Sequence, residues 1–203
     1  MYSRHRNVAL LLLSFAWPIA AQELVSFAPL RNDQPISYMI DASAAGPGFM
    51  ESDAELCAWA LEDWGAHSDG HLSFEPVSGD AAIIRISFVS SQSGLFGEMR
   101  PIIVSGQRGA EVFVRVEPDA PGIDPLLRDT IVYLTCLHEL GHALGLAHTD
   151  AFEDIMYFFG YGGDIDEYFG RYRRRLESRD DIRSTSGLSA ADVDRIHLLY
   201  PDV

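Results

Sequence analysis

The chain has 203 residues, enough for one domain with its own hydrophobic core. Hydrophobic residues make up 47% of it, a share typical of globular proteins and too high for a disordered chain. The net charge is −15 and all basic residues are arginine. This acidity argues against nucleic acid and anionic membranes as partners, and the absence of lysine excludes lysine-based covalent catalysis.

The first 21 residues have the features of a secretory signal peptide. Arg4 and Arg6 give a positive start, Val8–Ala16 is a short apolar core, and Ala20 and Ala21 lie next to the expected cleavage point. The apolar run is shorter than the roughly 20 residues that span a bilayer. We therefore predict a signal peptide at 1–21 and a mature chain at 22–203 that is secreted, extracellular or periplasmic, without a membrane anchor.

Patterns of apolar residues predict five strands and two helices within residues 36–144. The first helix starts at a capping box formed by Ser52 and Glu55 and runs to about Trp64. The second spans about residues 124–144. Pro101 suits an edge strand because proline cannot donate a ladder hydrogen bond. The expected strands cover residues 36–41, 72–77, 81–89, 99–104 and 111–117.

The second predicted helix carries the strongest functional signal, the motif HELGHALGLAH. His138 and His142 are four residues apart, so both imidazoles leave one face of a helix and can share a tetrahedral zinc ion. Glu139 stands beside them, where a carboxylate can take a proton from a zinc-activated water. Gly145 can adopt positive φ and turn the chain so that His148 becomes the third ligand. Three protein ligands leave one position open, which is typical of a catalytic site.

The two cysteines lie on the apolar stripes of the two predicted helices. Cys57 belongs to the first helix and Cys136 to the second, where Thr135 shares a different face with the two histidines. We expect the two helices to pack on the same side of the sheet. An exported protein can keep a disulfide, so a Cys57–Cys136 bridge and two buried free thiols both remain open.

The zinc motif and the methionine that follows it, Met156, resemble the signature of the metzincin peptidases. Phe158 stands where the astacin and serralysin branches have a ligating tyrosine, so the chain is most similar to the matrixins, the matrix metalloproteinase family. The resemblance implies an α+β fold in a single metzincin-like domain at 22–203. That domain would hold a twisted, mixed five-stranded sheet and three main helices, with the zinc site on the second helix and Met156 in a tight turn beneath the metal.

The resemblance also carries expectations about substrate and regulation. It implies that a polypeptide substrate binds along the edge strand at 99–104, the alternative being an edge that proline merely caps. We expect a monomer. Thr149 replaces the serine that usually follows the third histidine of matrixins. No histidine lies between Leu72 and Leu137, so the second, structural zinc site of the family has no visible ligands. No cysteine-switch propeptide is visible either.

The segment at 158–186 is longer than the usual matrixin connection. Its first aromatic residues, Phe158, Phe159 and Tyr161, are expected to form the wall of the main specificity pocket. The run Arg171–Arg175 is interpreted as a solvated helix face paired with acidic residues downstream, namely Glu177, Asp180 and Asp181. A closing helix follows, with its capping signal at Ser189 and Asp192.

Two other groups of potential metal ligands are weaker than the histidine motif. The first group is His67, Asp69 and His71; its spacing is loose, and we interpret it as a solvated loop. The second group is Asp164, Asp166 and Glu167, which offer oxygen ligands for Ca²⁺. Its spacing matches no calcium loop, so calcium is an unsupported alternative.

These features predict a secreted endopeptidase with one catalytic Zn²⁺ held by His138, His142 and His148. Glu139 would take a proton from water and pass it to the leaving amine. One alternative is a zinc amidase that cuts a cell-wall peptide or another non-protein amide. The other is a non-catalytic binding module, but a structural zinc would normally fill four protein positions and would not need Glu139.

Overall fold

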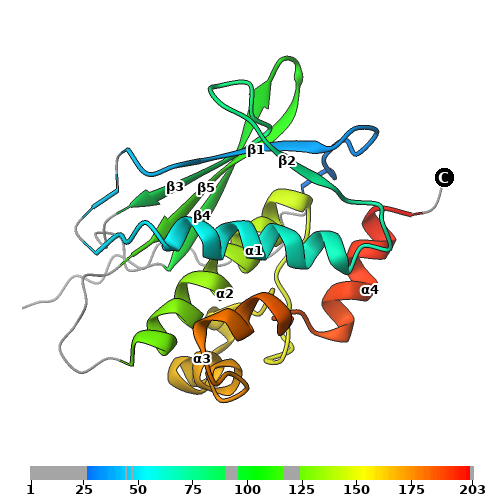
Figure 1. The fold of residues 1–203 in the computed structure, drawn as a ribbon. Helices are drawn as coiled ribbons and strands as arrows, with labels where there is room; N and C mark the ends of the chain where they lie inside the picture. Colours follow the sequence, from blue (N-terminus) through cyan, green and yellow to red (C-terminus); the bar gives the residue numbers. More distant parts are fainter. Residues whose placement is uncertain (1–26, 44, 47, 90–95, 117–123, 202–203) are drawn as a thin grey trace, which may run out of the picture.

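The computed structural model describes residues 27–43, 45–46, 48–89, 96–116 and 124–201. The predicted signal peptide at 1–21 lies outside the described residues. The elements of the described chain, in order, are β1 (Ile36–Asp41), α1 (Asp53–Ala66), β2 (Phe74–Pro76), β3 (Ile84–Val89), β4 (Gly97–Val104), β5 (Gln107–Arg115), α2 (Pro125–Leu144), the 3-10 helix Phe159–Tyr161, α3 (Ile165–Arg173), the 3-10 helix Arg179–Ser184 and α4 (Ala190–Leu199). Together they form the α+β fold that the resemblance implies, with one mixed sheet and helices against it (Figure 1).

The five strands form one mixed sheet in the order β2-β1-β3-β5-β4. All neighbours are parallel except β4, which runs antiparallel to β5 and is joined to it by a tight turn at Ser105 and Gly106. The edge position predicted from Pro101 is confirmed. The strand begins at Gly97, two residues before the expected start at residue 99.

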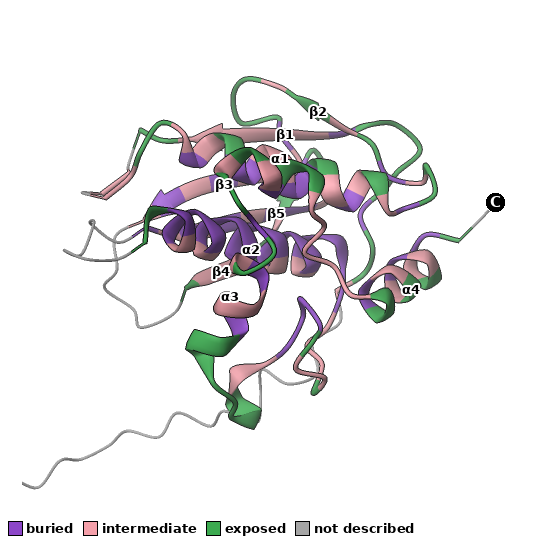
Figure 2. Ribbon diagram, turned by 60° about the horizontal axis from the view of Figure 1, so that its bottom comes forward, coloured by how far each residue is buried: buried purple, intermediate pink, exposed green. Residues whose placement is uncertain are grey.

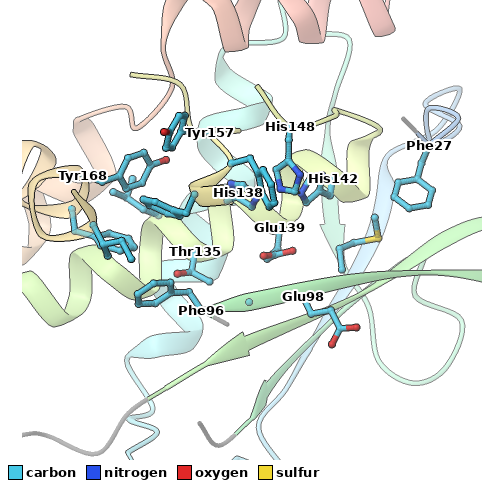
Figure 3. A pocket seen from close by; sticks show the side chains of 17 residues that line it. Phe27, Phe96, Glu98, Thr135, His138, Glu139, His142, His148, Tyr157 and Tyr168 are labelled. Atoms are coloured by element: carbon cyan, nitrogen blue, oxygen red, sulfur yellow. The ribbon is translucent and has the colours of Figure 1, made fainter. Parts of the chain in front are cut away.

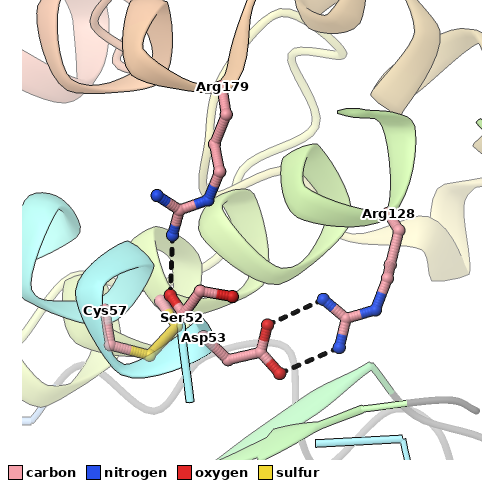
Figure 4. Close-up of a disulfide and its surroundings, with 6 residues drawn as sticks. Ser52, Asp53, Cys57, Arg128 and Arg179 are labelled. Carbon is pink, nitrogen blue, oxygen red and sulfur yellow. Dashed lines mark hydrogen bonds and ion pairs between the residues drawn. A yellow bond between two sulfur atoms is a disulfide. The ribbon is translucent and has the colours of Figure 1, made fainter. Parts of the chain in front are cut away.

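Helices α1 and α2 pack against each other, and α2 also lies against β4 and β5. Figure 2 shows that α2 is buried along most of its length. A disulfide joins Cys57 of α1 to Cys136 of α2 (Figure 4), so the bridge is confirmed over the two free thiols. The bridge ties the second helix, with its histidines, to the first helix across the core.

The predicted capping box at the start of α1 is wrong. Ser52 is the N-cap residue but already has helical dihedrals (φ −64°, ψ −17°), and its side chain makes no capping hydrogen bond. Asp53, the first residue of the helix, does not cap it either: its carboxylate accepts from the N–H of Met50, before the helix, at 2.8 Å and pairs with Arg128 of α2 at 2.7 Å. Figure 4 shows this pair beside the disulfide.

The C-terminal third contains more helix than the three main helices expected. Helix α3 forms within the long segment after Met156, and α4 closes the chain with the predicted capping box at Ser189 and Asp192. The arginines of the 171–175 run do not pair with the predicted acids. Arg173 pairs with Asp124, Arg174 with Glu167, and Arg171 donates to the Phe152 carbonyl.

Within the described residues, no helix is long and apolar enough to cross a membrane.

Candidate metal centre and substrate cleft

His138 and His142 lie on one face of α2, near its C-terminal end. The helix is well defined at both ends: Asp124 caps its N-terminus by accepting from the Leu126 N–H, and Pro125 occupies the first turn. Gly145 ends it with φ of 118°, the left-handed conformation predicted for this position. A Cβ at Gly145 would also lie 2.9 Å from the Phe27 carbonyl oxygen, so the turn has no space for a side chain.

The turn after Gly145 brings His148 back to the two helical histidines. The chain then pairs with the segment around Met156: the Thr149 N–H donates to the Met156 carbonyl at 2.8 Å, and the Phe158 N–H donates to the Thr149 carbonyl at 3.0 Å. One ring nitrogen from each of His138, His142 and His148 lies within 4.8 Å of the other two. Among the described residues, this is the one cluster of three or more histidine, cysteine, aspartate or glutamate side chains that can share an ion.

Backbone carbonyls orient two of the imidazoles. His138 Nδ1 lies 2.6 Å from the Ile155 carbonyl oxygen, and His142 Nδ1 lies 2.9 Å from that of Leu146. Burial lowers the pKa of both rings, so they are neutral at pH 7. A neutral ring that donates from Nδ1 presents the lone pair of Nε2, which is the form that binds a metal. The donor set therefore fits a zinc ion.

Met156 lies beneath the histidine helix, as the resemblance implies. Its side chain is fully buried, and a Cβ added at Gly141 of α2 would collide with its sulfur. The glycine between Leu140 and His142 thus lets the methionine pack directly against the helix backbone.

Glu139 points into the space next to the histidines (Figure 3) and is 6% exposed. Burial raises its pKa to about 8, and the negative charge of Glu98 adds to the rise. A divalent cation held by the neighbouring histidines would lower this pKa again. A buried carboxylate beside a candidate metal centre is suited to exchange protons with water there.

A cavity of about 390 Å³ runs along the histidines and Glu139 (Figure 3), within the range of ligand-binding pockets. Figure 3 shows Phe27 at one end of this cavity and Phe96, Thr135 and Tyr168 toward the other. We call the second end the aromatic pocket, because the rings of Phe96, Phe159, Tyr168 and Phe169 contact one another there; the lining of the cavity also includes Leu134, Thr135 and Ile165. Strand β4 contributes Gly97, Glu98 and Met99 to the same cavity.

The predicted pocket wall is only partly correct. Phe158 and Phe159 line the cavity, and the Phe158 ring lies 4.8 Å from the ring of His148. Tyr161 does not line it and is 53% exposed, because the 3-10 turn directs it to solvent.

Helix α3 supplies three further pocket residues that the sequence reasoning missed: Ile165, Tyr168 and Phe169. Asp164, considered above as a calcium ligand, accepts from the Glu167 N–H and caps this helix. Asp164 followed by Glu167 is a capping pattern that could have predicted α3. Arg108 was missed too: it donates to the carbonyls of His142 and Ala143 and lies over the Phe27 ring.

The weaker histidine loop does not form a shared centre. His67 pairs with Asp63 of α1, and Asp69 pairs with His197 of α4 at 3.5 Å. These contacts fit the interpretation of a surface loop that packs against helices.

The matrixin family model matches residues 125–169, from the start of α2 to α3. The matched part contains the three histidines, Met156 and the aromatic turn, and it covers less than a quarter of the chain. A comparison with curated proteins gave no match. The match and the histidine cluster support a zinc metallopeptidase, and the fold is consistent with a metzincin-like domain.

Proposed function

We propose that this protein is a secreted zinc-dependent endopeptidase. The observation that carries the proposal is the position of Glu139, buried in the same cavity as His138, His142 and His148. These three histidines would hold the ion, and the matrixin match across this part of the chain supports the same class of activity.

A zinc ion in this position supplies positive charge that polarises a carbonyl and makes a nearby water more acidic. The protein's own residues then handle the proton. Glu139 accepts it from the attacking water and delivers it to the amine that leaves, so one carboxylate serves as base and then as acid. Ile155 and Leu146 hold the imidazoles in orientation through their carbonyls.

An extended polypeptide is the substrate that the cleft suits best. Strand β4 pairs with β5 on one side only and contributes Gly97, Glu98 and Met99 to the cavity. A substrate strand added along this edge would pass directly over Glu139. The aromatic pocket would take the side chain that follows the cleaved bond. We expect the protein to act as a monomer, without nucleic acid or a membrane anchor.

Two features support export. The first 21 residues have the composition of a signal peptide. The Cys57–Cys136 disulfide is of a kind that persists in oxidising compartments and is rare in the cytosol.

The test compares the purified mature chain with its Glu139→Gln variant on a denatured protein substrate. We expect one zinc per chain in both, cleavage by the wild type that a zinc chelator abolishes, and at least about 100-fold slower cleavage by the variant. Glu62→Gln is the matched control, because it makes the same change at an exposed glutamate outside the cavity that pairs with Arg183. A fully active Glu139→Gln variant would contradict the assigned role, and absence of zinc from the folded wild type would contradict the metal centre.

A further inference from the structure

The aromatic pocket contains one polar side chain whose hydrogen bonding is not satisfied within the described part of the chain. Thr135 is 5% exposed, and its Oγ1 is buried without a hydrogen-bond partner there. Tyr168 donates from its hydroxyl to the carbonyls of Asp154 and Ile155, although its ring lines the same pocket. Tyr157, which also borders the cavity, donates to the Gly162 carbonyl.

Thr135 differs in this respect from another buried threonine of the same helix. Thr130 donates to the Leu126 carbonyl four residues earlier at 2.8 Å, which is the usual solution for a threonine within a helix. Thr135 makes no such bond. Because buried polar groups in proteins almost always have a partner, a hydroxyl without one calls for a partner from outside the chain.

The position of Thr135 places this hydroxyl next to the reacting centre. It lies one helical turn before Glu139, on the same face of α2. Its methyl group faces β4, since a Cβ at Gly97 would lie 2.8 Å from Thr135 Cγ2. Figure 3 shows its oxygen directed away from Glu139, toward the aromatic end of the cavity near Phe96.

The rings around the hydroxyl limit what it can meet. The rings of Phe96 and Phe169 meet edge to face with their centroids 5.1 Å apart, and those of Phe159 and Tyr168 do so at 5.0 Å. The pocket walls therefore present both ring faces and ring edges. Such walls favour an aromatic guest, whose ring can take part in the same edge-to-face geometry. A phenol adds one hydroxyl that can both donate and accept, which is what Thr135 Oγ1 lacks.

We propose that Thr135 is a specificity-determining residue that makes the aromatic pocket prefer tyrosine over phenylalanine in the substrate position after the cleaved bond. This inference rests on the proposed peptidase function. A phenylalanine in the pocket would leave the Thr135 hydroxyl buried and unpaired, whereas tyrosine satisfies it. The preference therefore comes from the hydroxyl and not from the size of the pocket.

The experiment uses two peptides that differ only in tyrosine or phenylalanine after the cleaved bond. For the wild type we expect kcat/KM to be about tenfold higher for the tyrosine peptide, the factor of one neutral hydrogen bond. In Thr135→Val the ratio should fall to about one or below, because the isosteric valine prefers the purely apolar ring. A ratio that is unchanged in Thr135→Val overturns the inference.

Thr130→Val is the matched control, because it removes a buried hydroxyl from the same helix outside the cavity. Thr130→Val should keep the wild-type ratio of kcat/KM for the tyrosine and phenylalanine peptides. Thr135→Ser should keep it too, because serine retains the hydroxyl; this variant covers the case in which valine at position 135 disturbs the fold. Loss of tyrosine preference in Thr130→Val or in Thr135→Ser would overturn the inference.

Binding to the Glu139→Gln background separates the inference from the proposed function. By calorimetry, this variant should bind the tyrosine peptide about tenfold more tightly than the phenylalanine peptide, and the added Thr135→Val change should abolish the difference. Preferential binding without cleavage of any peptide by the wild type would sink the peptidase proposal and support the role of Thr135. Cleavage by the wild type together with equal binding of both peptides would support the peptidase proposal and overturn the role of Thr135.

Discussion

Glu139 depends on a residue of another element for its position. A Cβ at Gly97 of β4 would lie 2.6 Å from Glu139 Cγ and 2.8 Å from its Oε1. Real Cβ atoms do not approach other atoms so closely, so the absence of a side chain at Gly97 lets the edge strand and the carboxylate share this space. The strand that would bind substrate and the proposed base are thus in direct contact.

Gly97→Ala should reduce peptidase activity without removing the metal. The added methyl group displaces the Glu139 side chain, and a shift of about 1 Å in a reacting group can cost about 100-fold. We expect kcat/KM to fall about 10- to 100-fold with unchanged zinc content, measured by peptide hydrolysis and metal analysis.

Gly65→Ala in α1 is the control for this prediction, since a Cβ there meets atoms only at ordinary distances of 3.5 Å or more. It should leave activity intact. Wild-type activity in Gly97→Ala would show that Glu139 can move freely and that the contact is unimportant.

At the residue scale, the sequence identified the histidine motif, Met156 and two aromatic residues of the cavity, Phe158 and Phe159, and missed the residues that α3 brings to it. The histidine spacing places His138 and His142 together on any helix, and Gly145 signals the turn to His148. No local pattern could predict that Gly97 touches Glu139 or that the Thr135 hydroxyl lacks a partner, because both follow from how β4 packs on α2.

At the scale of elements, the closing helix α4 supports the turn that carries Met156. Asp192 of α4 accepts from the Ile155 N–H at 2.8 Å, and the Ile155 carbonyl in turn contacts His138. Asp154, directly before Ile155, accepts from the hydroxyl of Ser189 and from Arg195. The last helix is therefore linked through three side chains to the orientation of a candidate metal ligand.

Asp154→Asn should weaken this link in a pH-dependent way. Burial alone would raise the pKa of Asp154, but hydrogen bonds from Ser189 and Arg195 outweigh it and lower the pKa below the usual 3.8. A lowered folded-state pKa gives stability that is complete above the unfolded value and is lost as the pH falls through the folded one.

We expect Asp154→Asn to lower the free energy of unfolding by about 2 kcal/mol at pH 7. The difference from wild type should be constant above about pH 5 and shrink as the pH falls below about 4. Urea unfolding at several pH values measures it. A difference that stays constant down to pH 2 would show that the charge of Asp154 is not involved.

Most elements were predictable, and the exceptions have a physical cause. The alternation in β3 is strong because every second residue of it is buried, and the apolar pattern of α2 is strong because most of that helix is buried. Helix α3 has only nine residues, and its buried side chains are large aromatics, so its stability depends on packing against α2. Ser52 shows the opposite error: the sequence has a capping pattern there, but the Ser52 side chain makes no capping hydrogen bond.

At the scale of the whole molecule, distant parts of the chain are held together covalently and by arginine. The disulfide links residues 79 positions apart. Beside it, Arg128 of α2 pairs with the buried Asp53, and Arg179 of the second 3-10 helix donates to the Ser52 carbonyl (Figure 4). The chain has no lysine, so these long-range contacts use arginine, whose planar group can bind two acceptors at once.

Replacing both cysteines, as Cys57→Ala with Cys136→Ala, should destabilise the protein strongly. Closing a loop of this length removes entropy from the unfolded chain and is worth about 4 kcal/mol in the chain-entropy description. We expect a loss of this order in urea unfolding of the oxidised wild type against the double variant. Reduced wild type, which keeps both sulfur atoms, is the control for packing, and a change below about 1 kcal/mol would contradict the stabilising role.

The same disulfide has a consequence for a protein that is proposed to be a secreted peptidase. The bridge closes a ring that contains β2, β3, β4, β5 and the first part of α2. A single break in any peptide bond of this ring leaves two fragments that stay joined through sulfur. A nicked molecule would therefore migrate as one chain until it is reduced, and the edge strand β4 would remain attached to the helix that carries His138 and His142.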